Sequence, residues 1–298
     1  MLDLEFLSRL HDQFQDELSA QPESFEIRGQ RFGHYPDDPA LMGVVNLSSD
    51  SWYRESVSLT TESAIRRGKR LMADGARLID LGAESTVLTA ERVDADGQQA
   101  ALLPVVNALA GEGALVSTET YSLEVAEACL EAGAAVLNLT AAANTAEFYK
   151  LAAAYKAGVV ICYIQGNNPR EVSDFDLATD HTSVLHDYFE TEIERATSAG
   201  VERLWIDPGL GFYYKNLQDS SERIRYQMQT FVNAFRLRKL GWPVCQALPH
   251  AFEYFEDDVR CAEPFFAVLA MLGKVDLLRT HEVSRVRGVL RTLSQYSP

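Results

Sequence analysis

Polar side chains that could bind a ligand or carry a proton recur at one kind of place in this sequence, directly after a short apolar run. In the clearest case, the run at 204–206 ends in Asp207 and a Pro-Gly-Leu-Gly turn follows at 208–211. The glycines of that turn allow the backbone to approach a ligand closely. An aspartate at such a turn often only caps its own loop. Because the arrangement repeats along the whole chain, we favour a shared site.

The repeated set mixes carboxylates and amides with a cationic pair near the end of the chain. Carboxylates and amides can bind the edge of a flat heterocycle that carries both donors and acceptors. Arg279 and His281 alternate along one run, so they can face the same side and suit an anion such as a phosphate. In chain order, the residues that follow the runs are Asn46, Asp50, Glu84, Ser85, Thr86, Glu119, Asn138, Gln165, Asp207, Gln246, His250, Arg279 and His281.

The apolar runs themselves predict buried strands, because they are short, rich in Val, Ile and Leu, and lack polar alternation. Helical patterns separate them, and several of these end in a glycine stop. The predicted strands cover 41–47, 77–82, 114–118, 134–139, 159–164, 203–207, 243–246 and 275–280. The predicted helices cover 61–74, 95–110, 122–132, 146–157, 182–199, 221–240, 264–272 and 284–293.

Eight strand-helix units in one chain predict an α/β fold of the TIM (β/α)8 barrel type, with the site on the rim at the carboxyl ends of the strands. A doubly wound sheet is the alternative, but no G-x-G-x-x-G follows the first strand. Residues 1–25 predict an amphipathic helix and 25–32 a short hairpin. We therefore expect an N-terminal extension, 1–40, packed on a barrel formed by 41–298.

Composition and charge exclude several classes of protein. A formal net charge of -16 over 298 residues argues against binding to nucleic acid or to an anionic membrane surface. The four cysteines lie far apart, so we expect reduced, mostly buried thiols in a cytoplasmic protein. Its first residues lack the charged and apolar regions of a signal peptide and no apolar run is long enough to span a membrane, so we expect neither feature.

Seven stretches of the chain resemble, in order, the motifs of dihydropteroate synthase, a family of pterin-binding barrels. The stretch Asp-Pro-Gly-Leu-Gly-Phe at 207–212 matches D-P-G-I-G-F, and Ile-Asp-Leu-Gly-Ala-Glu-Ser-Thr at 79–86 matches I-D-I-G-G-E-S-T. The other five stretches lie at 41–52, 117–121, 136–138, 162–166 and 279–283. Together they span most of the chain.

The resemblance implies a transferase of folate biosynthesis. In such an enzyme, pyrophosphate leaves the methylene group of a pterin and the amine of 4-aminobenzoate attacks the resulting cation. It implies that Asn138 and Asp207 bind the amino-pyrimidinone edge of the pterin and that Phe212 lies near the ring. Asn46, Arg279 and His281 would hold the diphosphate and its Mg²⁺, the only metal expected. The implied partners are a pterin-like diphosphate and an amine co-substrate, with a homodimer as the assembly.

On this basis we assign two groups of site residues. Catalytic roles are expected for Asn46, Asp50, His250, Arg279 and His281, with Asn46 also the metal ligand. Substrate contacts are expected for Ser85, Thr86, Glu119, Asn138, Gln165, Asp207, Gly211 and Phe212. His34, His181 and His186 are expected on the surface or in helices.

The sequence departs from the family pattern at four places. Ser49 stands for a proline, and Val87 and Leu88 follow Thr86 where an Arg-Pro-Gly is expected. Glu119 replaces an aspartate. His250 falls where the family has a lysine, and Pro249 where it has an arginine.

These departures favour a divergent relative in which the pterin and diphosphate sites are kept and the amine side is rebuilt. Two alternatives follow. One is a non-catalytic paralogue that binds a ligand or serves as an assembly subunit. The other is a methyltransferase that passes a methyl group from a folate to a corrinoid protein, although the first loop resembles the synthase branch more closely.

Overall fold

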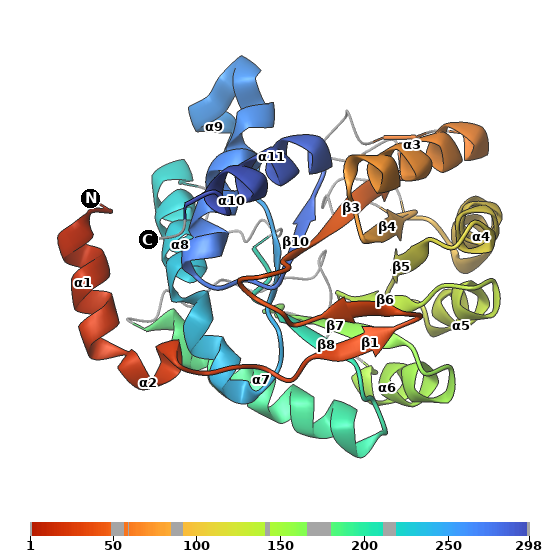
Figure 1. Ribbon diagram of the computed structural model, residues 1–298. Coiled ribbons are helices and arrows are strands. Elements are labelled where there is room, and N and C mark those ends of the chain that lie inside the picture. The colour runs from red at the N-terminus through yellow and green to blue at the C-terminus, as the bar shows by residue number, and fades with distance from the viewer. Residues whose placement is uncertain are drawn as a thin grey trace.

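The computed structural model describes residues 2–48, 57–58, 60–84, 92–140, 144–165, 180–210 and 219–296. At its centre, parallel strands form one sheet with helices around it (Figure 1). The strands are β3 (Ala40–Asn46), β4 (Leu78–Gly82), β5 (Leu115–Glu119), β6 (Val136–Leu139), β7 (Gly158–Cys162), β8 (Leu204–Asp207), β9 (Cys245–Ala247) and β10 (Leu277–Thr280). Their order is β8-β7-β6-β5-β4-β3-β10-β9, and a bridge between Ile206 and Val244 joins β8 to β9. The predicted TIM barrel is confirmed.

The helices that follow the strands also lie where the sequence predicts them. They are α3 (Thr61–Asp74), α4 (Ala95–Gly111), α5 (Leu123–Glu131), α6 (Thr145–Ala154), α7 (His181–Ser198), α8 (Ser220–Asn233), α10 (Ala262–Leu272) and α11 (Val283–Leu293). The helix predicted over 221–240 changes at Asn233 into the 3-10 helix η2 (Ala234–Leu240). Two short elements between β9 and α10, α9 (Phe252–Phe255) and η3 (Glu256–Cys261), were not predicted.

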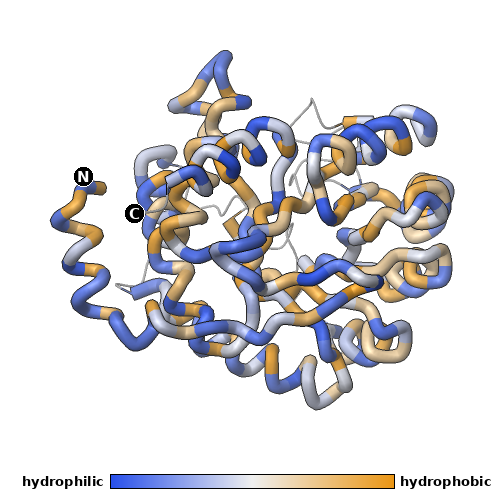
Figure 2. Tube along the Cα trace, in the orientation of Figure 1, coloured by the Kyte–Doolittle hydropathy of each residue, from blue (hydrophilic) through white to orange (hydrophobic). Residues whose placement is uncertain are grey.

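Local sequence explains where individual helices begin and end. The hydroxyl of Thr60 accepts the N–H of Ser63, and the carboxylate of Asp94 accepts the N–H of Gly97, so both residues cap orphan donors at helix starts. Helix α3 ends at Gly75, whose φ of 109° lies in the left-handed region. Along the peripheral helices, hydrophilic and hydrophobic segments alternate, as expected for helices with one buried face (Figure 2).

The N-terminal hairpin packs against Trp205, a buried residue of β8. Strands β1 (Phe25–Ile27) and β2 (Gln30–Phe32) pair antiparallel, which confirms the predicted hairpin. The ring centres of Phe25 and Phe32 lie 4.6 Å and 5.0 Å from the ring centre of Trp205, which is fully buried. Because Trp205 precedes Asp207 by two positions toward the amino end of β8, the hairpin covers the end of the barrel opposite the predicted rim.

The first helical segment is less embedded than the hairpin. The structure divides it into α1 (Leu4–Gln13) and α2 (Gln15–Leu18), and none of the residues of α1 is buried. Phe14 connects the segment to the barrel, since the guanidinium of Arg236 lies 4.1 Å from the centre of its ring. The division of the chain into 1–40 and 41–298 stays a prediction.

We expect Phe25→Ala to lower the free energy of unfolding by about 1–2 kcal/mol, because a partly buried ring and its edge contact with Trp205 are lost. Urea unfolding measures this change. Ligand binding at the other end of the barrel should be unaffected. A cost below a few tenths of a kcal/mol would show that the hairpin does not stabilise the barrel.

All four cysteines are free, and Cys129, Cys162 and Cys245 are buried, as the sequence predicts. Cys261 is exposed. Within the described ranges, no helix is both long and apolar enough to cross a membrane. The cytoplasmic location stays a prediction.

Candidate active site

Asp80, one layer below the carboxyl ends of the strands, is the centre of a buried polar network. The hydroxyl of Ser117 donates to its Oδ1 at 2.7 Å. The amide Nδ2 of Asn138 and the guanidinium Nε of Arg279 donate to its Oδ2, at 3.1 Å and 2.7 Å. Asp80 is fully buried. Side chains from β4, β5, β6 and β10 are therefore fixed around one carboxylate.

The contact with Asp80 also fixes the orientation of the Asn138 amide. A carboxylate only accepts hydrogen bonds, so Nδ2 of Asn138 must face Asp80. The amide oxygen then points to the other side, where it can accept an N–H of a ligand. Asn138 lies at the third position of β6 and is 5% exposed.

Glu119 is the second carboxylate that contacts Arg279. It ends β5, and its Oε2 accepts Nη2 of Arg279 at 2.7 Å. Burial, together with the charges of Asp80 and Asp207, raises the pKa of Glu119 to about 7 against the lowering effect of Arg279. Near neutral pH this carboxyl group is therefore divided between its protonated and ionised forms.

Asp207 is held at the end of β8 by the turn that follows it. Its Oδ1 accepts the N–H of Gly209 at 2.8 Å, and Gly209 has a φ of 77°, which a side chain would disfavour. Burial raises the pKa of Asp207 to about 6, against the lowering effects of the Gly209 N–H and of Arg279. The site thus places three carboxyl groups near a single guanidinium, and an N–H-rich ligand would complement this excess of acceptors.

The raised pKa values predict how stability changes with pH. A carboxyl group whose pKa is higher in the folded than in the unfolded protein stabilises the fold fully below its unfolded pKa. That contribution is lost as the pH rises through the folded pKa. For Glu119 and Asp207 the loss falls between about pH 4 and pH 7.

We expect Glu119→Gln to reduce the fall in unfolding free energy between pH 5 and pH 7.5 by about 1–2 kcal/mol, because glutamine does not titrate. Urea unfolding across this range measures the change. Since Asp207 still titrates in the variant, part of the fall should remain. An identical pH profile in parent and variant would contradict the assignment.

A second cluster lies beside this network, where His281 follows β10 and His250 follows β9. Nδ1 of His281 lies 2.8 Å from Oε1 of Glu263, and Nδ1 of His250 lies 3.5 Å from the same atom. Glu263 is fully buried in the first turn of α10. Burial and the neighbouring His281 together lower the pKa of His250 to about 3, against the raising effect of Glu263. The ring of His250 is therefore neutral at physiological pH.

Arg279 and His281 do not share one partner, although the sequence places them on the same strand end. Arg279 contacts carboxylates inside the barrel, whereas His281 contacts Glu263 of α10. Arg67 of α3 approaches the same region, with Nη2 3.3 Å from the backbone oxygen of His281. An anion at this strand end would thus lie near His281 and Arg67, whereas the charge of Arg279 is offset by Asp80 and Glu119.

The other predicted site residues are less informative. Asn46 ends β3 and is partly buried, and Gln165 is partly buried three positions after β7 ends. Gln246 is buried within β9, beside Leu278 of β10. Outside the described residues lie the predicted contacts Asp50, Ser85, Thr86, Gly211 and Phe212, together with Ser49, Val87 and Leu88.

Sequence reasoning missed Asp80, Glu263 and Arg67 as site residues. Asp80 stands inside an apolar strand within one of the family motifs, so a charged residue at a buried position was the available signal. The signals of Glu263 and Arg67 were weaker, because each lies in a helix and only the packing of that helix brings it to the strand ends.

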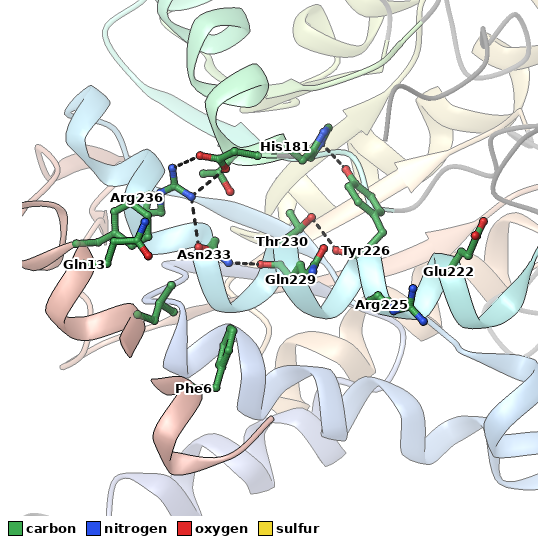
Figure 3. Close-up of a pocket in the computed structure, with 14 residues that line it drawn as sticks. Phe6, Gln13, His181, Glu222, Arg225, Tyr226, Gln229, Thr230, Asn233 and Arg236 are labelled. Atoms are coloured by element: carbon green, nitrogen blue, oxygen red, sulfur yellow. Dashed lines mark hydrogen bonds and ion pairs between the residues drawn. The ribbon is translucent and has the colours of Figure 1, made fainter. Parts of the chain in front are cut away.

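A separate cavity of about 480 Å³ lies on the outside of the barrel, between α1 and the helices α7 and α8 (Figure 3). Its polar groups contact one another: the hydroxyl of Tyr226 lies 2.6 Å from Nε2 of His181, and Arg236 pairs with Asp180 at 2.7 Å. His181 begins α7, where the sequence places it in a helix. We assign no chemistry to this cavity.

Comparison with known proteins gives one consistent result. A family model described as pterin binding enzyme matches residues 42–248. A dihydropteroate synthase of Streptococcus pyogenes serotype M3 is 29% identical over 268 residues, which cover 86% of this chain and 95% of that protein.

Solved structures agree. The dihydropteroate synthase of Thermus thermophilus in complex with 4-aminobenzoate is 26% identical, with a TM-score of 0.75 over 92% of this chain and 100% of its own. The enzyme of Xanthomonas albilineans with 4-aminobenzoic acid is also 26% identical, with a TM-score of 0.76 over 93% of this chain and 100% of its own.

Proposed function

This chain belongs to the pterin-binding enzymes, and from that premise we propose that it is a transferase of the dihydropteroate synthase type. It would join a pterin-like methyl diphosphate to an amine and release pyrophosphate. The observation that carries the proposal is the buried network around Asp80, Glu119, Asp207 and Arg279. It presents several fixed acceptors at the strand ends and one guanidinium between them.

The acceptors suit the amino-pyrimidinone edge of a pterin. Such an edge carries neighbouring N–H donors, and a carboxylate can accept two of them side by side. Asp207 is the candidate for this role because the Gly209 N–H fixes its position. Asn138 would accept a further N–H through its amide oxygen, since its Nδ2 already donates to Asp80. Both side chains are held before the ligand arrives.

The diphosphate would lie at the β3 and β10 ends, near Asn46 and His281. In a neutral His281 the proton on Nδ1 contacts Glu263, so Nε2 could donate to a phosphate oxygen only in the protonated ring, a form that the charge of a bound diphosphate would favour. The amide oxygen of Asn46 is a hard donor, and Mg²⁺ typically takes only one or two protein ligands when phosphate oxygens complete its shell. The residues present therefore fit Mg²⁺, which when bound would offset the charge of the departing pyrophosphate.

Little acid-base chemistry is needed for this reaction, because breaking the carbon-oxygen bond produces the pterin methylene cation that the amine then attacks. The chain's part is to hold the ring and to stabilise the leaving group. Protonation of Glu119, with its pKa of about 7, would leave more of the Arg279 charge for the diphosphate. A glutamate at position 119 is thus compatible with a guanidinium of Arg279 whose charge acts on the diphosphate.

The residues expected near the amine co-substrate favour either a different nucleophile or a less active synthase. His250 stands where the resemblance puts a lysine, and its buried ring is neutral. The charge that a lysine would bring is therefore not supplied by this side chain.

The test is release of pyrophosphate from 6-hydroxymethyl-7,8-dihydropterin diphosphate with Mg²⁺, in the presence of 4-aminobenzoate or of a panel of other aromatic and aliphatic amines. We expect release that depends on the amine. A reaction without amine is the control for hydrolysis. If the protein binds the pterin but no amine stimulates release, the transferase is excluded and the non-catalytic paralogue is favoured.

A further inference from the structure

We propose that His250, Glu263 and His281 form a binding site for one divalent transition-metal ion of the Zn²⁺ class. Two imidazoles and one carboxylate are a ligand set that holds such ions and leaves a coordination position open. The three residues come from separate places in the chain and meet beside the candidate diphosphate site. No metal was expected there from the sequence, because their spacing follows no metal-binding pattern.

The distances between the donor atoms support this assignment. One nitrogen of each imidazole and one oxygen of Glu263 lie within 4.8 Å of one another. Ligands about 2.0–2.2 Å from a common ion are roughly 3–3.5 Å apart. The two nitrogen-to-oxygen distances, 2.8 Å and 3.5 Å, are close to these separations. Rotation of the His250 ring would adjust the distance between the two imidazoles, whose centres lie 4.9 Å apart.

The carboxylate is fixed before any ion binds. Its Oε2 accepts the backbone N–H groups of His281 and Glu282 at 2.9 Å and 3.1 Å, as well as the hydroxyl of Thr280. These contacts hold Oε1 toward the two imidazoles. Hydrogen-bonded support of this kind is what a metal-binding carboxylate usually has. The remaining exposure of the histidines, 14% and 11% of their side chains, leaves a path for an ion.

Binding would change the hydrogen bond between His281 and Glu263 without consuming a proton. Nδ1 of His281 would bind the ion and the ring proton would move to Nε2, which would then be able to donate to an anion. The nitrogen donors separate this site from the one at Asn46, because Mg²⁺ prefers oxygen ligands. A bound ion would also bring positive charge to the place where the resemblance puts a lysine. This role of the ion rests on the proposed function, but the binding of the ion does not.

The test is titration of the full-length, chelator-treated protein with Zn²⁺ by calorimetry and with Co²⁺ by visible absorption, both without pterin. We expect one ion per chain, Co²⁺ bands typical of nitrogen and oxygen ligands, and no displacement by excess Mg²⁺. His250→Ala should weaken Zn²⁺ binding at least about 100-fold, because loss of a direct ligand should cost more than the roughly 10–100-fold that follows loss of a residue supporting a ligand. Glu263→Gln, which keeps an oxygen acceptor for the backbone N–H groups, should do the same.

His11→Ala is the matched control, because His11 lies exposed in α1 and its removal should leave the affinity unchanged. Absence of stoichiometric Zn²⁺ binding by the parent protein would overturn the proposal, as would unchanged affinity in His250→Ala. If Glu263→Gln does not fold, His250→Ala decides the question. Since no pterin is present, the outcome is independent of whether the chain is a transferase.

Discussion

Asp207→Asn is expected to weaken binding of 6-hydroxymethyl-7,8-dihydropterin diphosphate at least about 100-fold. The carboxylate would accept two ring N–H groups, and hydrogen bonds to a charged group each contribute about 1.5–3 kcal/mol. Asparagine keeps the shape but turns one acceptor into a donor, which then faces an N–H of the ligand. The combined loss exceeds the roughly 2.7 kcal/mol that corresponds to a 100-fold change. Calorimetry on parent and variant measures it.

The variant should fold, because the amide oxygen of asparagine can still accept the N–H of Gly209. Asp219→Asn is the matched control. Asp219 caps α8 through the N–H groups of Ser221 and Glu222, and asparagine is an equally good cap. Binding by that control should equal the parent's. An Asp207→Asn protein that binds the pterin within threefold of the parent would remove Asp207 from the site.

Asp80→Ala is expected to lower the free energy of unfolding by about 3–5 kcal/mol, as removal of one partner of a buried ion pair commonly does. Arg279 would lose its contact at 2.7 Å, and the donors on Ser117 and Asn138 would lose their shared acceptor. Urea unfolding of the parent and variant at pH 7.5 measures the change, provided that both unfold in one transition.

The double variant Asp80→Ala with Arg279→Met separates the ion pair from simple loss of packing. Because it removes a cation whose Nε has lost its acceptor and which only Glu119 still contacts, we expect it to recover part of the lost stability, with a coupling of about 1–3 kcal/mol. A destabilisation below about 1 kcal/mol in the single variant, or additive effects in the double variant, would show that Asp80 does not organise the network.

The sequence was most informative about the barrel itself. Buried parallel strands are continuous apolar runs, and glycine stops mark the turns that precede them, so all eight strands could be placed. The rim residues followed, because a residue that ends such a strand must lie at the carboxyl edge. Asn138 and Asp207 illustrate this, and each lies at or next to the end of its strand.

Contacts that depend on packing could not be placed in this way. Asp80 and Arg279 are 199 residues apart and meet only because β10 pairs with β3, which in turn pairs with β4. Glu263 reaches His281 because α10 packs beside β10, which no local pattern indicates. Packing also separates Arg279 from His281. Their alternation along the strand predicted that both would bind one anion, but the guanidinium of Arg279 pairs with carboxylates inside the barrel and His281 pairs with Glu263.

Calorimetric titration of the unmodified protein with 6-hydroxymethyl-7,8-dihydropterin diphosphate and Mg²⁺, with and without 4-aminobenzoate, tests the central claim most directly. A pterin site built on Asp207 and Asn138 predicts saturable binding of one ligand per chain that weakens below about pH 6, as Asp207 becomes protonated. Absence of binding at millimolar ligand would contradict the proposed site and with it the transferase that depends on it.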